Sequence, residues 1–100
     1  MQFNGSVIDF KSTGNEFSAK KFNGEAWVEF EKIGNKPSAV KIESICGKGD
    51  IGISLQLPDR LESVTTGVCR IDFDDCADGK YIIKATVKNA EDISIKYEFV

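Results

Sequence analysis

The stretch YIIKATVKNAEDISIKYEFV, residues 81–100, decides the fold class. Apolar and polar residues alternate through residues 81–88 and again through 93–100, and the polar segment NAED lies between the two runs. Because successive side chains of a strand point to opposite faces, each run is expected to have one buried face and one wet face. Two such runs joined by a short polar segment predict an antiparallel hairpin with its turn at residues 89–92.

The same alternation recurs upstream and predicts further short strands. They are expected near residues 3–10, 25–31, 39–46, 51–57 and 68–74. Asn23-Gly24 is expected to supply the positive φ angles of a two-residue hairpin turn, and GKGDIG at 47–52 is interpreted as another turn. No segment keeps a helical period over three turns. We therefore predict an all-β fold, a seven- or eight-stranded antiparallel sandwich, with residues 1–100 as one domain.

The last third of the chain resembles the end of immunoglobulin-like sandwiches. It consists of the strand VCRIDFD, the acidic loop DCADG, the strand KYIIKATV and a closing strand. In that family an Asp and a Gly precede a Tyr whose hydroxyl returns to the loop backbone, the tyrosine corner. The resemblance covers residues 68–100 and implies a Greek-key sandwich with Tyr81 as the corner and Asp78-Gly79 as its turn. Ile83 stands where antibody domains have their inter-sheet cysteine, so no such disulfide is expected.

Charge and cysteine content exclude several classes of protein. A net charge of −3 and an isoelectric point near 4.9 disfavour nucleic acid and anionic membranes as partners. The segment MQFNGSVIDF has neither the basic nor the apolar region of a signal peptide, and no stretch approaches the ~20 apolar residues of a membrane span. The three cysteines, Cys46, Cys69 and Cys76, are therefore expected to be free thiols in a reducing cytoplasm.

Catalytic residues are scarce. The chain has no histidine, which removes the commonest general base and the Ser-His and Cys-His nucleophile pairs. Three cysteines alone do not complete a zinc site, and no glycine-rich loop links a strand to a helix for phosphate binding. We predict no enzymatic activity, no cofactor and no metal.

The stretch DFDDCADGKY, residues 72–81, concentrates four aspartates within seven positions. Counted as a calcium loop from Asp74, it has Cys76 at the third position and Ala85 at the twelfth, where such loops need oxygen ligands. A looser calcium site between loops stays an alternative. The preferred interpretation is a turn that also forms an acidic contact face.

Acidic residues are concentrated in the segment that contains this stretch. Residues 50–78 hold seven acids and two arginines and carry −5, whereas 1–49 and 79–100 each carry +1. Such an asymmetric field accelerates encounter with a basic partner. An ordinary solvated face is the alternative.

Trp27, the only tryptophan, is expected on the outer face of its strand. Alternation turns Ala26, Val28 and Phe30 inward and leaves Trp27 among glutamates. An exposed tryptophan flanked by acids is typical of an interface anchor, and it could also stack on a sugar ring. A strand covered on both faces would explain it without any binding role.

These features favour a small acidic cytoplasmic protein that binds and inhibits a basic protein. In size, acidity and lack of a leader the chain resembles bacterial immunity proteins, which neutralise a cognate toxin, often a basic nuclease. The predicted contact residues are Asp72, Asp74, Asp75, Asp78 and Trp27. The alternative is an adhesion or carbohydrate-binding module of a larger extracellular protein, with Trp27 or the loops contacting glycan.

Overall fold

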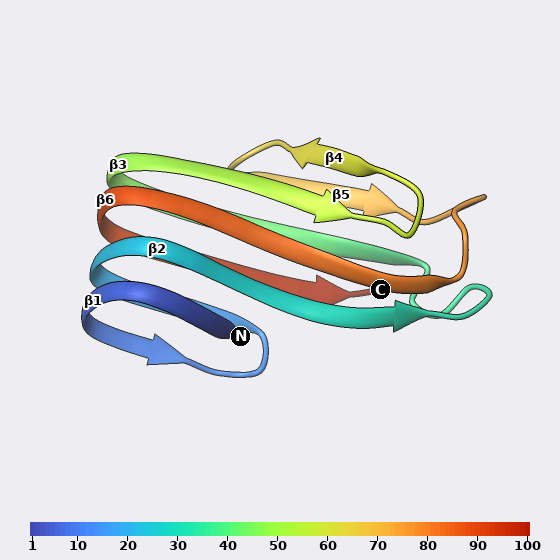
Figure 1. Ribbon diagram of the computed structural model, residues 1–100, viewed down its shortest axis with the longest axis horizontal. Coiled ribbons are helices and arrows are strands. Elements are labelled where there is room, and N and C mark those ends of the chain that lie inside the picture. Colours follow the sequence, from blue (N-terminus) through green and yellow to red (C-terminus); the bar gives the residue numbers. More distant parts are fainter.

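The computed structural model describes all 100 residues, and every regular element in it is a β-strand. One antiparallel sheet contains the six strands in the order β1-β2-β6-β3-β4, and β5 also pairs with β3 (Figure 1). The strands are β1 (Gln2–Ser12), β2 (Glu16–Lys32), β3 (Ala39–Gln56), β4 (Leu61–Val64), β5 (Val68–Asp72) and β6 (Gly79–Phe99). The predicted all-β antiparallel class is confirmed. The structure contains no helix suited to crossing a membrane.

The sheet is folded in half, because its long strands turn back midway (Figure 1). The front layer contains the C-terminal half of β2 and the N-terminal half of β6. The back layer contains the N-terminal half of β2 and the C-terminal half of β6. The rings of Phe3 and Phe10, on one strand, have centroids 4.9 Å apart. In an extended strand seven residues span about 23 Å, so this contact requires β1 itself to fold back.

Residues with positive φ mark the line along which the sheet folds. Gly5, Gly24, Gly49 and Asn89 lie in neighbouring strands with φ of 131°, 158°, 93° and 48°. Register shifts occur at the same place in β2 and β3. A Cβ on Gly49 would lie 2.4 Å from the Asn89 carbonyl oxygen, so the backbones approach too closely there for a side chain.

A second set of residues with positive φ lies beside the fold line, at the folded end of the molecule. Asp9 and Asp92 have φ of 50° and 53° on the two strands that flank β2. Between the two lines Phe22 and Ala90 point inward and are 2% and 1% exposed. Side chains therefore fill the folded edge, while most loops lie at the opposite end, which we call the open end because the strands stop there (Figure 1).

The apolar faces of the two layers pack against each other and form the core. Phe30 of the front layer has its ring centroid 4.8 Å from that of Phe99 in the back layer. The largest fully buried side chains come from both layers and are Tyr81, Phe17, Phe22, Phe73, Ile42, Leu55, Ile83, Ile93, Ile95, Val40 and Val87. The sheet thus buries its apolar face against itself.

The predicted strand count of seven or eight is wrong, because three predicted turns lie inside continuous strands. Residues 89–92 belong to β6, Asn23-Gly24 to β2 and residues 47–52 to β3. Each segment contains a residue with positive φ, although Asn23 does not have the positive φ expected of it. The same backbone geometry serves a fold across the sheet as well as a hairpin turn within it. The predicted strand at 25–31 is the second half of β2. The predicted hairpin at 81–100 is almost the whole of the single strand β6.

Gly49→Ala should destabilise the protein by about 2–4 kcal/mol, since its Cβ would meet backbone and its φ is unfavourable for alanine. Gly52→Ala is the matched control on the same strand, where an added Cβ has nothing within 4 Å. Urea unfolding of both variants measures the difference. Equal stability of the two would contradict the role of the fold line.

Candidate functional site

The acidic loop between β5 and β6 lies at the open end of the molecule. A four-residue turn begins it, closed by the Cys76 amide, which donates to the Phe73 carbonyl at 3.1 Å. Asp74 and Asp75 occupy the middle of this turn, where Asp75 has φ of 60°. Both are exposed and neither forms an ion pair. They are the free charges of the loop.

Both ends of the loop are fixed to the fold. Phe73 is 2% exposed, and its ring packs 5.3 Å from that of Tyr81. Its amide donates to the Ser38 carbonyl at 2.9 Å. The Tyr81 hydroxyl donates to the Ala77 carbonyl at 2.7 Å. Because these contacts hold the loop on both sides of its turn, the two free aspartates are held in place before any partner binds.

A buried lysine adds a third anchor. Lys32 is only 4% exposed, and its ammonium donates to the Cys76 carbonyl at 2.9 Å. The same ammonium lies 3.4 Å from Asp78 Oδ1. A buried ammonium needs such partners, since burial of an unpaired charge is costly. Lys32 therefore ties the end of β2 to the acidic loop.

The turn at residues 33–36 lies beside the loop and exposes an apolar side chain. Ile33 and Lys36 exchange backbone hydrogen bonds of 3.0 and 3.1 Å, and the Gly34 amide donates to Asp78 Oδ1 at 2.9 Å. The Ile33 side chain is 68% exposed. An exposed apolar residue on a turn that is hydrogen-bonded to the acidic loop is a combination that suits a protein interface.

Of the four predicted aspartates, two form ion pairs and two do not. Asp72 pairs with Arg70 at 3.2 Å and Asp78 pairs with Lys32, so their charges are partly neutralised. Asp74 and Asp75 stay free. The field of the loop therefore comes mainly from two of the four residues.

The other acids of residues 50–78 add little to this field. Asp59 and Glu62 both contact Arg60, at 3.6 and 2.8 Å. These neighbours raise the pKa of Arg60, mainly through its hydrogen bond to Glu62. Asp50 lies near the fold line instead. The charge beside the loop is therefore less negative than the −5 of residues 50–78, because Asp50 lies elsewhere and Lys32 of β2 adds one positive charge.

Trp27 is not part of this site. It lies on the outer face of the front layer and is partly exposed. Lys32 is five positions further along β2, about 16 Å along the strand. Two of its glutamate neighbours pair with lysines of β6, Glu25 with Lys84 at 3.3 Å and Glu29 with Lys80 at 2.9 Å. The charges of these two glutamates are therefore balanced by lysines.

The carboxylates do not converge on a cation. No group of three or more carboxylate or thiol side chains lies close enough together to hold a metal ion. Cys46, Cys69 and Cys76 are free and partly buried. The Cys76 thiol accepts a hydrogen bond from Arg60 at 3.8 Å, which adds to the packing of the loop.

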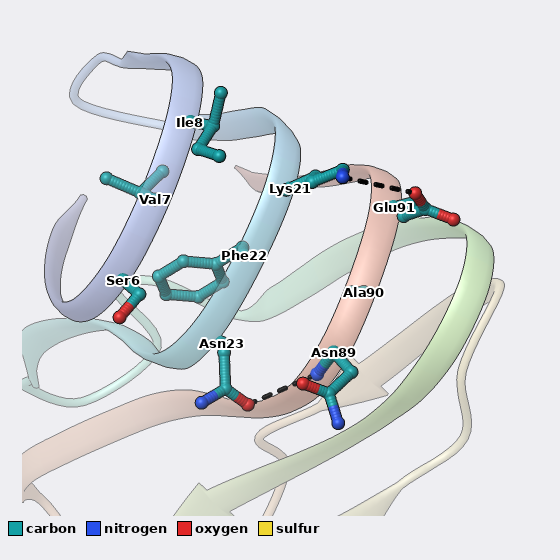
Figure 2. A pocket seen from close by; sticks show the side chains of 9 residues that line it. All are labelled: Ser6, Val7, Ile8, Lys21, Phe22, Asn23, Asn89, Ala90 and Glu91. Atoms are coloured by element: carbon teal, nitrogen blue, oxygen red, sulfur yellow. Dashed lines mark hydrogen bonds and ion pairs between the residues drawn. The ribbon is translucent and has the colours of Figure 1, made fainter.

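A hollow of about 420 Å³ lies at the folded end, away from the acidic loop (Figure 2). Lys21 and Glu91 lie on one side of it, 3.9 Å apart, and on the other side the Asn89 amide donates to Asn23 Oδ1 at 3.1 Å. Ile8 from the edge strand adds an apolar wall. None of the predicted site residues reaches this hollow.

Sequence reasoning missed Lys32 and Ile33, although a signal for each was present. Lys32 continues the inward phase of Ala26, Val28 and Phe30, which is an unusual place for a lysine. Ile33 directly precedes the Gly34-Asn35 turn, where the alternation ends. Neither signal indicates that the end of β2 and the turn at residues 33–36 contact the acidic loop.

No protein-family model matches the chain, and no curated protein matches it.

Lys32→Ala should destabilise the protein by about 1–3 kcal/mol, because the Cys76 carbonyl and Asp78 would lose their partner. Amide hydrogen exchange in residues 73–78 should become faster. Lys36→Ala, an exposed lysine on the neighbouring turn, is the matched control. Unchanged exchange in Lys32→Ala would show that the loop is held without this anchor.

Stability should fall in alkaline solution as the tyrosines ionise. Burial raises the pKa of both Tyr81 and Tyr97 above 10.0. Their hydroxyls donate to the Ala77 and Gly14 carbonyls, and a phenolate cannot donate. A pKa raised by folding means that the stabilisation is complete below pH 10 and is lost as the pH rises through the folded-state value.

Urea unfolding from about pH 9 to about pH 11 measures this loss. The double variant Tyr81→Phe/Tyr97→Phe should lose less stability over the same range, because it lacks the two hydroxyls. An equal loss in both proteins would contradict the prediction.

Proposed function

We propose that the protein is a small acidic inhibitor that binds a basic protein through the loop at residues 73–78. The kind of partner we propose is a toxin such as a nuclease, neutralised in the cytoplasm in the manner of bacterial immunity proteins. The observation that carries the proposal is the pair of free carboxylates, Asp74 and Asp75, at the tip of a loop that is anchored on both sides. The protein acts by binding and not by catalysis.

The anchored loop favours tight binding. A loop that is ordered before binding loses little conformational freedom in the complex, so more of the contact energy appears as affinity. Asp74 and Asp75 would meet lysines or arginines around a cleft that normally binds a polyanion, and they would also accelerate association. Asp72 and Asp78, already paired, contribute less.

Ile33 would supply the apolar contact that charges alone do not provide. Hot spots of interfaces are desolvated side chains surrounded by a polar rim. Ile33 is the exposed apolar side chain beside the acidic loop, and Gly34 is joined to that loop through Asp78. The predicted anchor, Trp27, lies too far along β2 to share a compact interface with the loop.

The immunoglobulin-like, Greek-key arrangement stays part of the proposal. The hydroxyl of Tyr81 donates to the carbonyl of Ala77, which is the kind of bond that a tyrosine corner uses. The strand order, however, keeps all six strands in one folded sheet. An experimental structure compared with immunoglobulin-like domains tests the arrangement.

The function is tested by capture followed by inhibition. The purified protein is immobilised, exposed to a lysate of the source cell and washed with rising salt. A basic protein retained in stoichiometric amount is then assayed for nuclease activity with and without the inhibitor. Inhibition at equimolar ratio supports the proposal, and retention of no basic protein, or retention without inhibition, counts against it.

The double variant Asp74→Asn/Asp75→Asn should reduce the association rate with that partner about tenfold at low ionic strength, and less at high salt. Asp50→Asn/Asp92→Asn is the matched control, since it removes two exposed and unpaired carboxylates near the folded end. Stopped-flow measurement gives both rates. Equal slowing by the two variants would mean that net charge matters and the loop does not.

A further inference from the structure

Trp27 stands between two hollows on the outer face of the front layer. Trp27 and Glu29 line both of them. The first hollow, of about 470 Å³, is completed by Met1, Gln2, Gly14 and Val28. The second, of about 250 Å³, is completed by Glu25, Gln56, Ile82 and Lys84. An indole that lines open space on two sides offers apolar surface to a ligand in either hollow.

The two carboxylates that line the second hollow are each paired with a lysine. Glu25 pairs with Lys84 and Glu29 pairs with Lys80, each carboxylate with one ammonium. Gln56 lies in the same cross-strand row as Glu29, because both pair with Ile82 of β6. The second hollow therefore combines acceptors and donors in fixed positions beside an aromatic surface, and neither an anion nor a cation is favoured there.

We propose that this face binds a neutral oligosaccharide. The apolar C–H face of a pyranose ring packs on the indole of Trp27, and the ring hydroxyls exchange hydrogen bonds with the Glu29 carboxylate and the Gln56 amide. The hollow on the other side of Trp27 accepts a neighbouring sugar unit. The proposal does not rest on the proposed inhibitor function, since the two sites lie on different faces.

The chemistry of the face favours a sugar over a protein partner. A protein interface of ordinary size needs a broad apolar centre. Beside Trp27 the second hollow has Ile82 as its only other apolar residue, and the remaining lining is charged or amide. A ligand with many hydroxyls and one apolar face matches this composition, whereas a large apolar protein surface would leave the ion pairs buried without water.

Fluorescence gives a direct test, because Trp27 is the only tryptophan of the chain. The protein is first applied to an array of neutral glycans, and cellotetraose, maltotetraose and chitotetraose are then titrated in solution. We expect a saturable change in the Trp27 emission with at least one neutral glycan. No binding on the array, together with unchanged emission in all three titrations, would overturn the proposal.

Variants connect the signal to the site. Trp27→Ala and Gln56→Ala should each weaken the affinity for the bound glycan, the first by about tenfold or more in calorimetry. Ile45→Ala, an exposed apolar residue on the outer face of the back layer, is the matched control and should bind normally. Equal affinity of Trp27→Ala and Ile45→Ala would refute the site.

The basic partner of the acidic loop provides an independent readout. If that partner binds and leaves the Trp27 emission unchanged while a glycan changes it, two separate sites are supported. If the partner protects Trp27 and no glycan binds, Trp27 belongs to a protein interface and the sugar proposal fails, although the inhibitor function stands. If a glycan binds and no basic partner exists, the inhibitor function fails and the sugar site stands.

Discussion

The structure depends on one constraint: a single sheet with one apolar face has nothing else to cover it. The chain forms no helix and no second sheet, and three of its strands are 17, 18 and 21 residues long. Exposed to water, the apolar face would lose the hydrophobic stabilisation on which a domain of this size depends. Folding the sheet across its strands brings the two halves of that face together. The contact between Phe30 and Phe99 shows the result, because the two residues belong to opposite layers.

This fold determines where binding surfaces can form. At the folded end the backbones of β3 and β6 approach so closely at Gly49 that no side chain fits, and Phe22 and Ala90 close the interior. At the open end the chain must reverse through loops, and these are free to carry charges. The loop at 73–78 lies there, held by Phe73 from within and by Lys32 from the neighbouring strand. The outer face of the front layer carries paired charges, among which Trp27 is the largest apolar group.

The aspartates and Trp27 were expected to form one interface. In the structure the aspartates lie in or next to the acidic loop and Trp27 lies on the outer face of the front layer. Asp74 and Asp75 are suited to electrostatic steering, and Ile33 is their apolar neighbour. Trp27 lies among balanced ion pairs and is suited to an uncharged ligand. The two proposals can therefore be tested independently, since a substitution in one site leaves the contacts of the other unchanged.

The sequence by itself determined the class of fold. Alternation of apolar and polar residues shows which side chains face inward, whether or not the strand later bends. Ala26, Val28 and Phe30 and the positions around Tyr81 follow from that rule. The positive φ expected at Asn23-Gly24 occurs at Gly24 and not at Asn23. Only the tertiary structure decided that this place is a fold within one strand, because positive φ serves both a hairpin turn and a bend. It also decided which aspartates stay free, since the partners of Asp78 come from the end of β2, more than forty residues away in sequence. Pairing of charges depends on distances between strands, and local patterns carry no information about those distances.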